Sequence, residues 1–411
     1  MTKMDIIDAA FRVWGRDYYR KTSLSQLAKE LGVSKPALYR HFESKQALIT
    51  AMFERFFDAF TDSVRSDFDK ALQINDSDEG VLIIIKSISS YFALNGFHLI
   101  FSLVNIYDCK IDGRTMSERI NERGVDLTII RRVVEKKYIA LTEVIQLIFA
   151  SLTFSLAYFH NANKSFDEPP SDQQVQKIIF ALYDSVKFGL KFYPKDIDAL
   201  DFDKLETMVD GTMYSEEINP LFKAVAEAVA EAGPWKASME MVAKRMGLSK
   251  SSLYGYFKNR KDMLRRLFLS EFNRITDFAR QGVKLSSDAA EQFYLGIYSI
   301  AVYLRSHHEI LIAIGWIRTR KLDLGKPNKK AEFFRIFDDI KIESLCDITD
   351  EEKHNISHWV LFLLINTLTR PYISGELNYN DRSSFLSDKL KNNDIRILYK
   401  FITLGLGGFL K

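Results

Sequence analysis

The stretch SKPALYRHF occupies residues 34–42, and a close variant of it, SKSSLYGYF, occupies residues 249–257. Over the longer segments 28–42 and 243–257, more than half of the aligned positions are identical. The two copies start 215 positions apart. Solenoid proteins repeat with a period of roughly 20–50 residues, so this repeat does not belong to a solenoid. The 411-residue chain therefore contains two copies of one domain-sized unit.

Each copy has the pattern of a helix, a tight turn and a second helix. In the first copy, Leu24 and Leu27 begin an apolar stripe with helical spacing. Ser23, followed three positions later by Gln26, matches a capping box at the start of that helix. Gly32 permits the left-handed backbone that commonly ends a helix.

The second helix of each copy combines a buried side with a small and basic outward side. Ser34 is placed to cap it, and Pro36 falls in its first turn, where a missing N–H does no harm. Leu38 and Phe42 lie one helical turn apart and point toward the core. The outward positions are then Lys35, Pro36, Ala37, Tyr39, Arg40 and His41 in the first copy, and Lys250, Ser251, Ser252, Tyr254, Gly255 and Tyr256 in the second.

Charge gathers on the two copies of the repeat. The whole chain has a net charge of +3, but residues 1–50 carry nine Lys and Arg against five Asp and Glu. Residues 221–266 carry ten Lys and Arg against four Asp and Glu, so the remainder of the chain is acidic. Basic islands of this kind attract polyanions, while an acidic body is repelled by them.

These residues resemble the TetR family of bacterial transcriptional regulators. The resemblance rests on TSLSQLAKELGVSKPALYRHFESKQAL at 22–48 and on ASMEMVAKRMGLSKSSLYGYFKNRKDM at 237–263. It implies an all-α fold with two units in one chain. Each unit would have a helix-turn-helix three-helix domain followed by a helical ligand-binding and dimerisation bundle, and the two units would form a pseudo-dimer.

The expected domains follow from the position of each copy. They are a first DNA-binding domain over 1–47, a first regulatory domain over 48–193, a linker over 194–216, a second DNA-binding domain over 217–262 and a second regulatory domain over 263–411. Residues 194–220 carry eight Asp and Glu against two lysines. Part of this segment has helical potential, but as a whole it indicates a spanning linker.

The resemblance assigns the outward residues to DNA. A short helix whose N-terminal end carries small side chains can approach base edges in the major groove, while basic and hydroxyl side chains around it reach phosphates. The expected DNA-binding residues are Thr22, Ser23, Ser34, Lys35, Pro36, Ala37, Tyr39, Arg40, His41 and Lys45 in the first copy, and Ser238, Ser249, Lys250, Ser251, Ser252, Tyr254, Tyr256 and Arg260 in the second.

Some positions depart from the family pattern. Tyr18 stands where the family usually has glycine before the second helix, and Ala237 replaces a threonine. Gly255 replaces the arginine found at position 40, which removes a phosphate donor and weakens a helix interior by about 1 kcal/mol relative to alanine. We call each helix-turn-helix copy a reading head. The second reading head is expected either to bind DNA more weakly than the first or to depend more on Lys258, Arg260 and Lys261.

The regulatory halves are rich in large aromatic residues. The family resemblance implies a cavity in each half for a small-molecule effector, and an apolar or aromatic effector suits these side chains. Plain core packing is the alternative role for the same residues. The candidate ligand-binding residues are Phe101, Tyr107, Phe154, Tyr158, Trp316, Trp359 and Phe362.

The sequence offers no pattern for catalysis, for a metal site or for a cofactor. His354 and His358 lie one helical turn apart, but no third ligand follows at a recognisable spacing. The most apolar stretch, residues 144–159, is short for a bilayer span. Cys109 and Cys346 match no metal or redox motif. We therefore expect a bacterial cytoplasmic, nucleoid-associated protein that is not an enzyme and does not bind membranes.

The expected function is that of a ligand-responsive regulator that binds double-stranded DNA and acts as a repressor. Unlike reading heads predict an operator with unlike half-sites. The alternative is a helical ligand-binding or scaffold protein whose second head, or both, no longer binds DNA. A monomeric pseudo-dimer is expected, with a homodimer carrying four heads as its rival.

Overall fold

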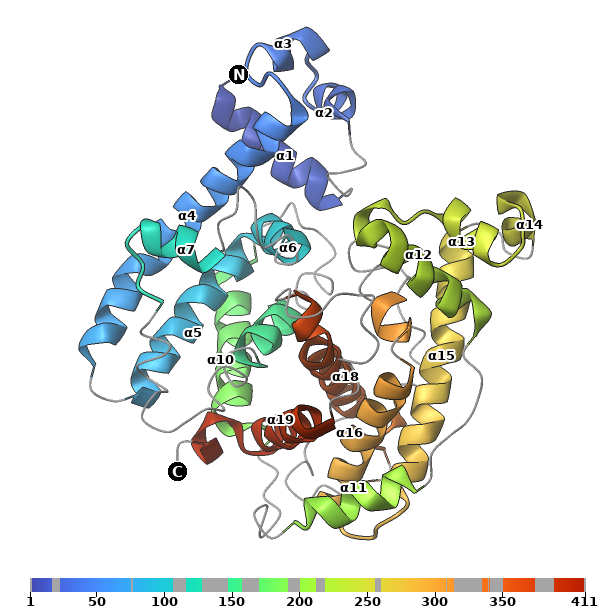
Figure 1. Cartoon of the computed structure of the whole chain (residues 1–411). Coiled ribbons are helices and arrows are strands. Elements are labelled where there is room, and N and C mark those ends of the chain that lie inside the picture. Colours follow the sequence, from blue (N-terminus) through green and yellow to red (C-terminus); the bar gives the residue numbers. More distant parts are fainter. Residues whose placement is uncertain are drawn as a thin grey trace. The chain divides into compact units, whose positions relative to one another are not determined.

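In the computed structural model, the described residues are mainly α-helical and include no strand (Figure 1). These are residues 2–16, 23–74, 77–105, 116–127, 147–156, 170–190, 200–211, 219–255, 260–307, 309–313, 335–338, 340, 350–373 and 388–409. They form two compact units, Met1–Asp184 and Ser185–Lys411. The all-α fold and the two-unit arrangement expected from the sequence are confirmed.

The first unit begins with three short helices and continues into longer ones. Its helices are α1 (Lys3–Arg16), α2 (Leu24–Glu30), α3 (Lys35–Tyr39), α4 (Lys45–Gln73), α5 (Ser77–Leu94), α6 (Gly96–Asn105) and α7 (Met116–Glu122), followed by Leu147–Leu156 and by α10 (Asp172–Phe188), which ends in the second unit.

Helix α4 joins the N-terminal three-helix domain to the helical body of its unit. Ser44 caps its first turn, with the Ala47 N–H donating to Ser44 Oγ at 3.0 Å. Buried side chains then recur once per helical turn, for example at Met52, Phe56 and Phe60. This spacing keeps one face of the helix in the core along its length, and α5 packs against it.

The second unit repeats this plan after an additional helix. Its helices are α11 (Phe202–Asp210), α12 (Pro220–Lys236), α13 (Met239–Arg245), α14 (Lys250–Gly255), α15 (Arg260–Val283), α16 (Ala289–Ser306), α18 (Asp350–Ile373) and α19 (Asp388–Phe409).

The two units share a register as well as an order of helices. Helices α4 and α15 start at the same offset in numbering as the two copies of the opening motif, and α5 and α16 are offset equally at both of their ends. Thr61 on α4 donates to the Phe57 carbonyl at 2.7 Å, and Thr276 on α15 donates to the Phe272 carbonyl at 2.8 Å. The sequence repeat therefore extends into the bodies, well beyond the opening motif.

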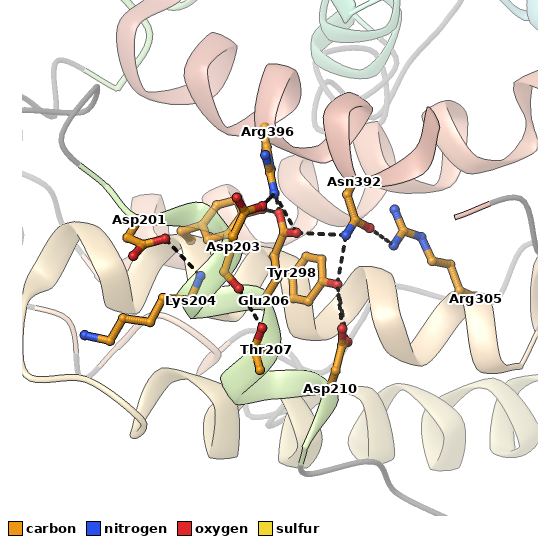
Figure 2. A network of polar contacts seen from close by, with 11 residues as sticks. Asp201, Asp203, Lys204, Glu206, Thr207, Asp210, Tyr298, Arg305, Asn392 and Arg396 are labelled. Carbon is orange, nitrogen blue, oxygen red and sulfur yellow. Dashed lines mark hydrogen bonds and ion pairs between the residues drawn. The ribbon is translucent and has the colours of Figure 1, made fainter. Parts of the chain in front are cut away.

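Helix α11 lies inside the acidic segment between the two copies and packs on α16. Its Glu206 is only 5% exposed. The carboxylate accepts hydrogen bonds from the Tyr294 hydroxyl at 2.6 Å, from Asn392 Nδ2 at 2.8 Å and from the Arg396 guanidinium at 2.7 and 2.8 Å (Figure 2). Over residues 202–210 the segment is thus a docked helix and not only a spanning linker.

Further contacts extend this α11 network along both sides of the helix. Asp203 pairs with Arg396 at 2.5 Å, and the Tyr298 hydroxyl donates to Asp210 at 3.3 Å (Figure 2). The ring of Phe202 meets that of Tyr294 edge-on, with centroids 4.7 Å apart. Because every ionised group here has a partner, burial of this polar cluster is compatible with a stable fold.

Two glycines at equivalent ends of the repeat meet in the second unit. Gly189 follows α10 with φ of 60°, and Gly405 kinks α19 with φ of 59°. The Leu190 N–H donates to the Ile402 carbonyl at 2.8 Å. A Cβ atom on Gly189 would lie 2.5 Å from the Ile402 oxygen, and one on Gly405 would lie 2.4 Å from the Gly189 nitrogen. Only residues without a side chain allow this close approach.

Among the described helices, no single one is both long enough and apolar enough to span a membrane. One sharply bent pair, Glu79–Leu94 with Gly96–Ser102, passes the same test of length and composition.

Candidate nucleic-acid interface

The first reading head is built by the capping pattern that the sequence predicts. The Gln26 N–H donates to Ser23 Oγ at 3.2 Å, and the Ser23 N–H donates to Gln26 Oε1 at 2.7 Å, so the capping box is present. Gly32 has φ of 65° and turns the chain between α2 and α3. The Ala37 N–H then donates to Ser34 Oγ at 3.3 Å and starts α3.

Helix α3 separates a buried side from an outward side. Leu38 and Phe42 are 1% and 4% exposed and fix the helix to the domain core. Tyr39 is 43% exposed although it is a large aromatic residue. An exposed tyrosine of this kind points to a partner surface, since burying its ring stabilises a domain more than solvent exposure does.

The outward side of α3 is basic and amphipathic. Lys35, Pro36 and Arg40 are exposed, while Ala37 and His41 are half-buried. The Lys35 ammonium lies 5.7 Å from the centre of the Tyr39 ring, a cation–π distance. The regular helix ends at Tyr39, earlier than the segment 34–42 expected from the sequence, because residues 40–42 continue as a turn. Lys45 begins α4 and is half-buried.

The second reading head has the same frame with different outward chemistry. The Met241 N–H donates to Ser238 Oγ at 3.3 Å, Gly247 has φ of 68°, and Leu253 is buried under α14. The Ser252 N–H donates to Ser249 Oγ at 2.9 Å. The same oxygen lies 2.8 and 2.7 Å from the hydroxyls of Ser251 and Ser252, so three hydroxyl groups gather at the N-terminal end of this helix.

The remaining outward positions of the second head are more open. Lys250 and Gly255 are exposed, and Tyr254 is half-buried. A Cβ atom added at Gly255 would meet nothing within 4 Å. Packing therefore does not require glycine at this position. Because the first head has Arg40 at the equivalent position, the second head has the smaller cationic surface.

Some predicted residues fall outside the described structure. These are Thr22 and Tyr256, together with the expected core residue Phe257; for Arg260 only the backbone is described, as the first residue of α15. The assignment of all the expected residues to DNA contacts stays a prediction.

The helix α1 of the first head is joined to the body by an aromatic cluster. The Phe11 ring lies 4.3 Å from the His98 ring and 5.0 Å from the Phe101 ring, both on α6. Phe56 of α4 lies 5.8 Å from each of them. Phe101, a candidate ligand-binding residue, is thus placed where head and body meet in this unit.

A buried polar pair lies within this cluster. The Tyr91 hydroxyl and His98 Nδ1 are 2.6 Å apart and share a hydrogen bond. Burial is the main cause that lowers the pKa of His98 to about 4, and it raises the pKa of Tyr91 well above its usual range. Both groups are therefore neutral at neutral pH. This pair was not predicted from the sequence, because one tyrosine and one histidine seven positions apart form no recognisable motif.

The other candidate ligand residues occupy separate places. Trp359 on α18 is buried, with its ring 6.5 Å from that of Phe401 on α19. Phe362 on α18 and Phe154 on Leu147–Leu156 are half-buried. Tyr107, Tyr158 and Trp316 lie outside the described residues. Their ligand-binding role stays a prediction.

Metal binding finds no support in the part of the chain that is described. Within that part, no group of three or more His, Cys, Asp or Glu side chains is placed to hold a metal ion.

Both reading heads match one known protein family. Residues 6–52 and 221–267 each match the family model described as bacterial regulatory proteins, tetR family. The fatty acid metabolism regulator protein of Bacillus subtilis (strain 168) is 26% identical over 166 residues, which is 39% of this chain and 85% of that protein. The uncharacterized HTH-type transcriptional regulator YuxN of the same organism is 38% identical over 53 residues, 13% of this chain and 18% of that protein.

Two solved structures are also similar. The TetR family transcriptional regulator PfmR from Thermus thermophilus matches with a TM-score of 0.33 and 21% identity, over 44% of this chain and 95% of that one. The fatty acid degradation regulator FadR from Bacillus halodurans matches with a TM-score of 0.32 and 15% identity, over 46% and 98%. The matched proteins are regulators rather than enzymes. Each half thus begins with a segment that matches the DNA-binding domain of this family, which is consistent with a tandem regulator of the TetR family.

Proposed function

We propose that this regulator is a ligand-responsive repressor that reads an asymmetric operator with two unlike heads in one chain. The observation that carries the proposal is the contrast between the outward faces of α3 and α14. One presents Pro36, Tyr39 and Arg40, and the other presents Ser251 and Gly255 on the same capped frame. A symmetric dimer has identical heads and gains nothing from unlike half-sites.

The presence of two reading heads in one chain supports a pseudo-dimer. Family dimers bring one reading head per subunit, so a single chain of this kind already carries the pair. We therefore propose that one chain supplies both heads and acts as a monomer.

Selection of DNA from a random pool tests the operator proposal. The expected product has two half-sites of different sequence, about one helical turn or more apart. Recovery of a perfect palindrome would overturn it. Light scattering tests the state of the same preparation, for which we expect the mass of one 47.5 kDa chain and not of two.

Substitution of the paired tyrosines separates the two heads. Tyr39→Ala and Tyr254→Ala are each expected to weaken operator binding by a monomer. If only Tyr39→Ala weakens it, the second head is not a reader, and the alternative of a chain with one degenerate head is favoured. Affinity should also fall steeply with salt, since phosphate contacts release counterions. A ligand-binding or scaffold protein would show neither effect.

The proposed effector is a small apolar or aromatic molecule. The many aromatic side chains in both bodies support this proposal. In addition, one matched relative is named a fatty acid metabolism regulator. Release of DNA on binding such a molecule requires different effector affinities for the bound and the free arrangement of the heads.

A further inference from the structure

The shared register of the two bodies allows buried residues to be compared position by position. Tyr91 on α5 and Tyr303 on α16 are equivalent, since each stands at the same place within its helix. Phe56 on α4 is equivalent to Glu271 on α15 when the two helices are aligned at their starts. The equivalent of His98 is Ile310, by the alignment of α5 with α16.

The hydroxyl group of the equivalent tyrosine has a different partner in each unit. In the first unit it pairs with His98 from α6, while the α4 position holds the apolar Phe56. In the second unit the Tyr303 hydroxyl donates to Glu271 Oε1 at 2.6 Å, while the position of the histidine holds Ile310, 1% exposed. The polar partner has moved to another helix and has changed from an imidazole to a carboxylate.

The carboxylate of Glu271 is buried with half of its hydrogen-bonding capacity unused. The side chain is only 1% exposed. Among the described residues, Oε2 has no hydrogen-bond partner, and its ion-pair partner Arg274 keeps Nη1 at 3.8 Å, beyond hydrogen-bond distance. A carboxylate accepts hydrogen bonds at both oxygens, and leaving one of them buried without a hydrogen bond is costly.

The tyrosine that donates to this carboxylate is itself surrounded by aromatic rings. The Tyr303 ring stacks on His307 with centroids 4.3 Å apart, and the Phe278 ring lies 5.9 Å from Tyr303. The His307 Nδ1–H donates to the Tyr303 carbonyl at 2.9 Å, since a carbonyl can only accept, and this fixes the imidazole against the tyrosine. Aromatic faces next to a buried anion are the combination that attracts an organic cation.

We propose that the second unit binds a cationic effector, an organic amine, whose ammonium group donates to Glu271 Oε2 beside Tyr303. This proposal rests on the proposed function, because it names the effector class for one of the two bodies. The first unit offers no carboxylate at the equivalent place. The two bodies are therefore expected to respond to different molecules.

Binding requires the side chains that cover Oε2 to separate. The hydrogen bond gained by this oxygen favours the opened state, and association is expected to be slower than at a preformed site, because binding requires a conformational change. A slow approach to equilibrium is thus part of the expected result.

Calorimetry with the full chain in the absence of DNA tests the site. The probes are 2-phenylethylamine, 2-phenylethanol and 3-phenylpropionate, which share a ring and differ in charge. The amine is expected to bind, and Glu271→Gln is expected to weaken it about tenfold or more, because a charge-assisted hydrogen bond becomes a neutral one. Tyr303→Phe should weaken it less, and the matched Tyr91→Phe in the first unit should leave it unchanged.

Two results would overturn the proposal. One is an amine that binds no more tightly than the alcohol. The other is amine binding that Glu271→Gln weakens no more than Asp69→Asn does, a variant that removes an exposed charge on α4. Thermal melting of each variant without ligand shows whether it is folded. Operator binding is measured separately: if the amine binds through Glu271 but leaves DNA affinity unchanged, the site stands and ligand-responsive repression by this unit fails.

Discussion

Replacement of Glu206 tests whether α11 is held to the second unit by the α11 network. Glu206 accepts four hydrogen bonds while 5% exposed. Glu206→Gln keeps the shape but removes the charge, and its amide N–H₂ then faces donors of Asn392 and Arg396. Hydrogen bonds to charged groups contribute about 1.5–3 kcal/mol each and are not additive. Arg396 is 29% exposed and keeps Asp203, so we expect a loss of about 2–3 kcal/mol.

Hydrogen exchange of peptides covering 202–210 measures this loss locally. A two-unit chain does not unfold in one step, so a global midpoint is a poor measure of one helix. The expected loss corresponds to exchange that is faster by a factor of about 30 to 160. Arg396→Gln should produce a similar change. The double variant should cost about 1.5 kcal/mol less than the sum of the two, because both remove the same interaction.

Lys204→Gln is the matched control for this experiment. Lys204 lies on the same helix, is exposed, and bonds within the network only through its backbone N–H to Asp201 at 3.0 Å. Its substitution should leave exchange unchanged. Unaltered exchange in Glu206→Gln, or strictly additive effects in the double variant, would refute the reasoning.

Three further predictions concern the head, the first body and the helix ends. In a mobility-shift assay, Gly255→Arg should bind the operator several-fold more tightly than Gly255→Ala. A Cβ atom at position 255 meets nothing within 4 Å, and the arginine side chain supplies a phosphate donor. A weaker complex would count against DNA binding by the second head. Acidification should destabilise the first unit through His98, whose pKa is about 4 in the folded chain and about 6.5 in the unfolded chain. The contribution of neutral His98 to the stability of the fold is complete above pH 6.5 and is lost as the pH falls. The loss is about 2 kcal/mol at pH 5. Hydrogen exchange of peptides covering 91–101, measured at pH 7 and 5 and corrected for the intrinsic rate at each pH, tests this, and the difference should shrink in His98→Gln. Gly405→Ala should cost more than about 2 kcal/mol, since its Cβ would lie 2.4 Å from the Gly189 nitrogen. Gly124→Ala, with φ of 79° and open space around it, should show only the backbone cost of about 1 kcal/mol, and equal melting of the two variants would contradict the close approach.

The reading heads could be predicted from the sequence because local rules determine them. A capping serine with Gln26, a glycine at the turn and apolar residues at helical spacing act within about ten residues of one another. The capping box, the positive φ of Gly32 and the burial of Leu38 were accordingly predictable, and the structure confirms them. Gly247 and Leu253 at the equivalent positions of the second head follow the same rules.

The bodies were less predictable because their important contacts join distant residues. Glu206 and Arg396 are 190 positions apart, and the sequence showed only an acidic segment. The polar pairs of Tyr91 and Tyr303 depend on which helices meet, which composition does not reveal. The roles given to DNA-contacting and ligand-binding residues stay predictions, since contacts with a partner molecule leave no local pattern of their own.

The meeting of Gly189 with Gly405 has a consequence for how such a chain can evolve. In a dimer of identical subunits, one mutation changes both sides of a symmetric contact at once, so an unfavourable change is suffered twice. In this chain each glycine is encoded separately, and one may change while the other is kept. Gene duplication thereby frees every paired position of the repeat to vary alone, and differences such as that between Tyr91–His98 and Tyr303–Glu271 can accumulate one residue at a time.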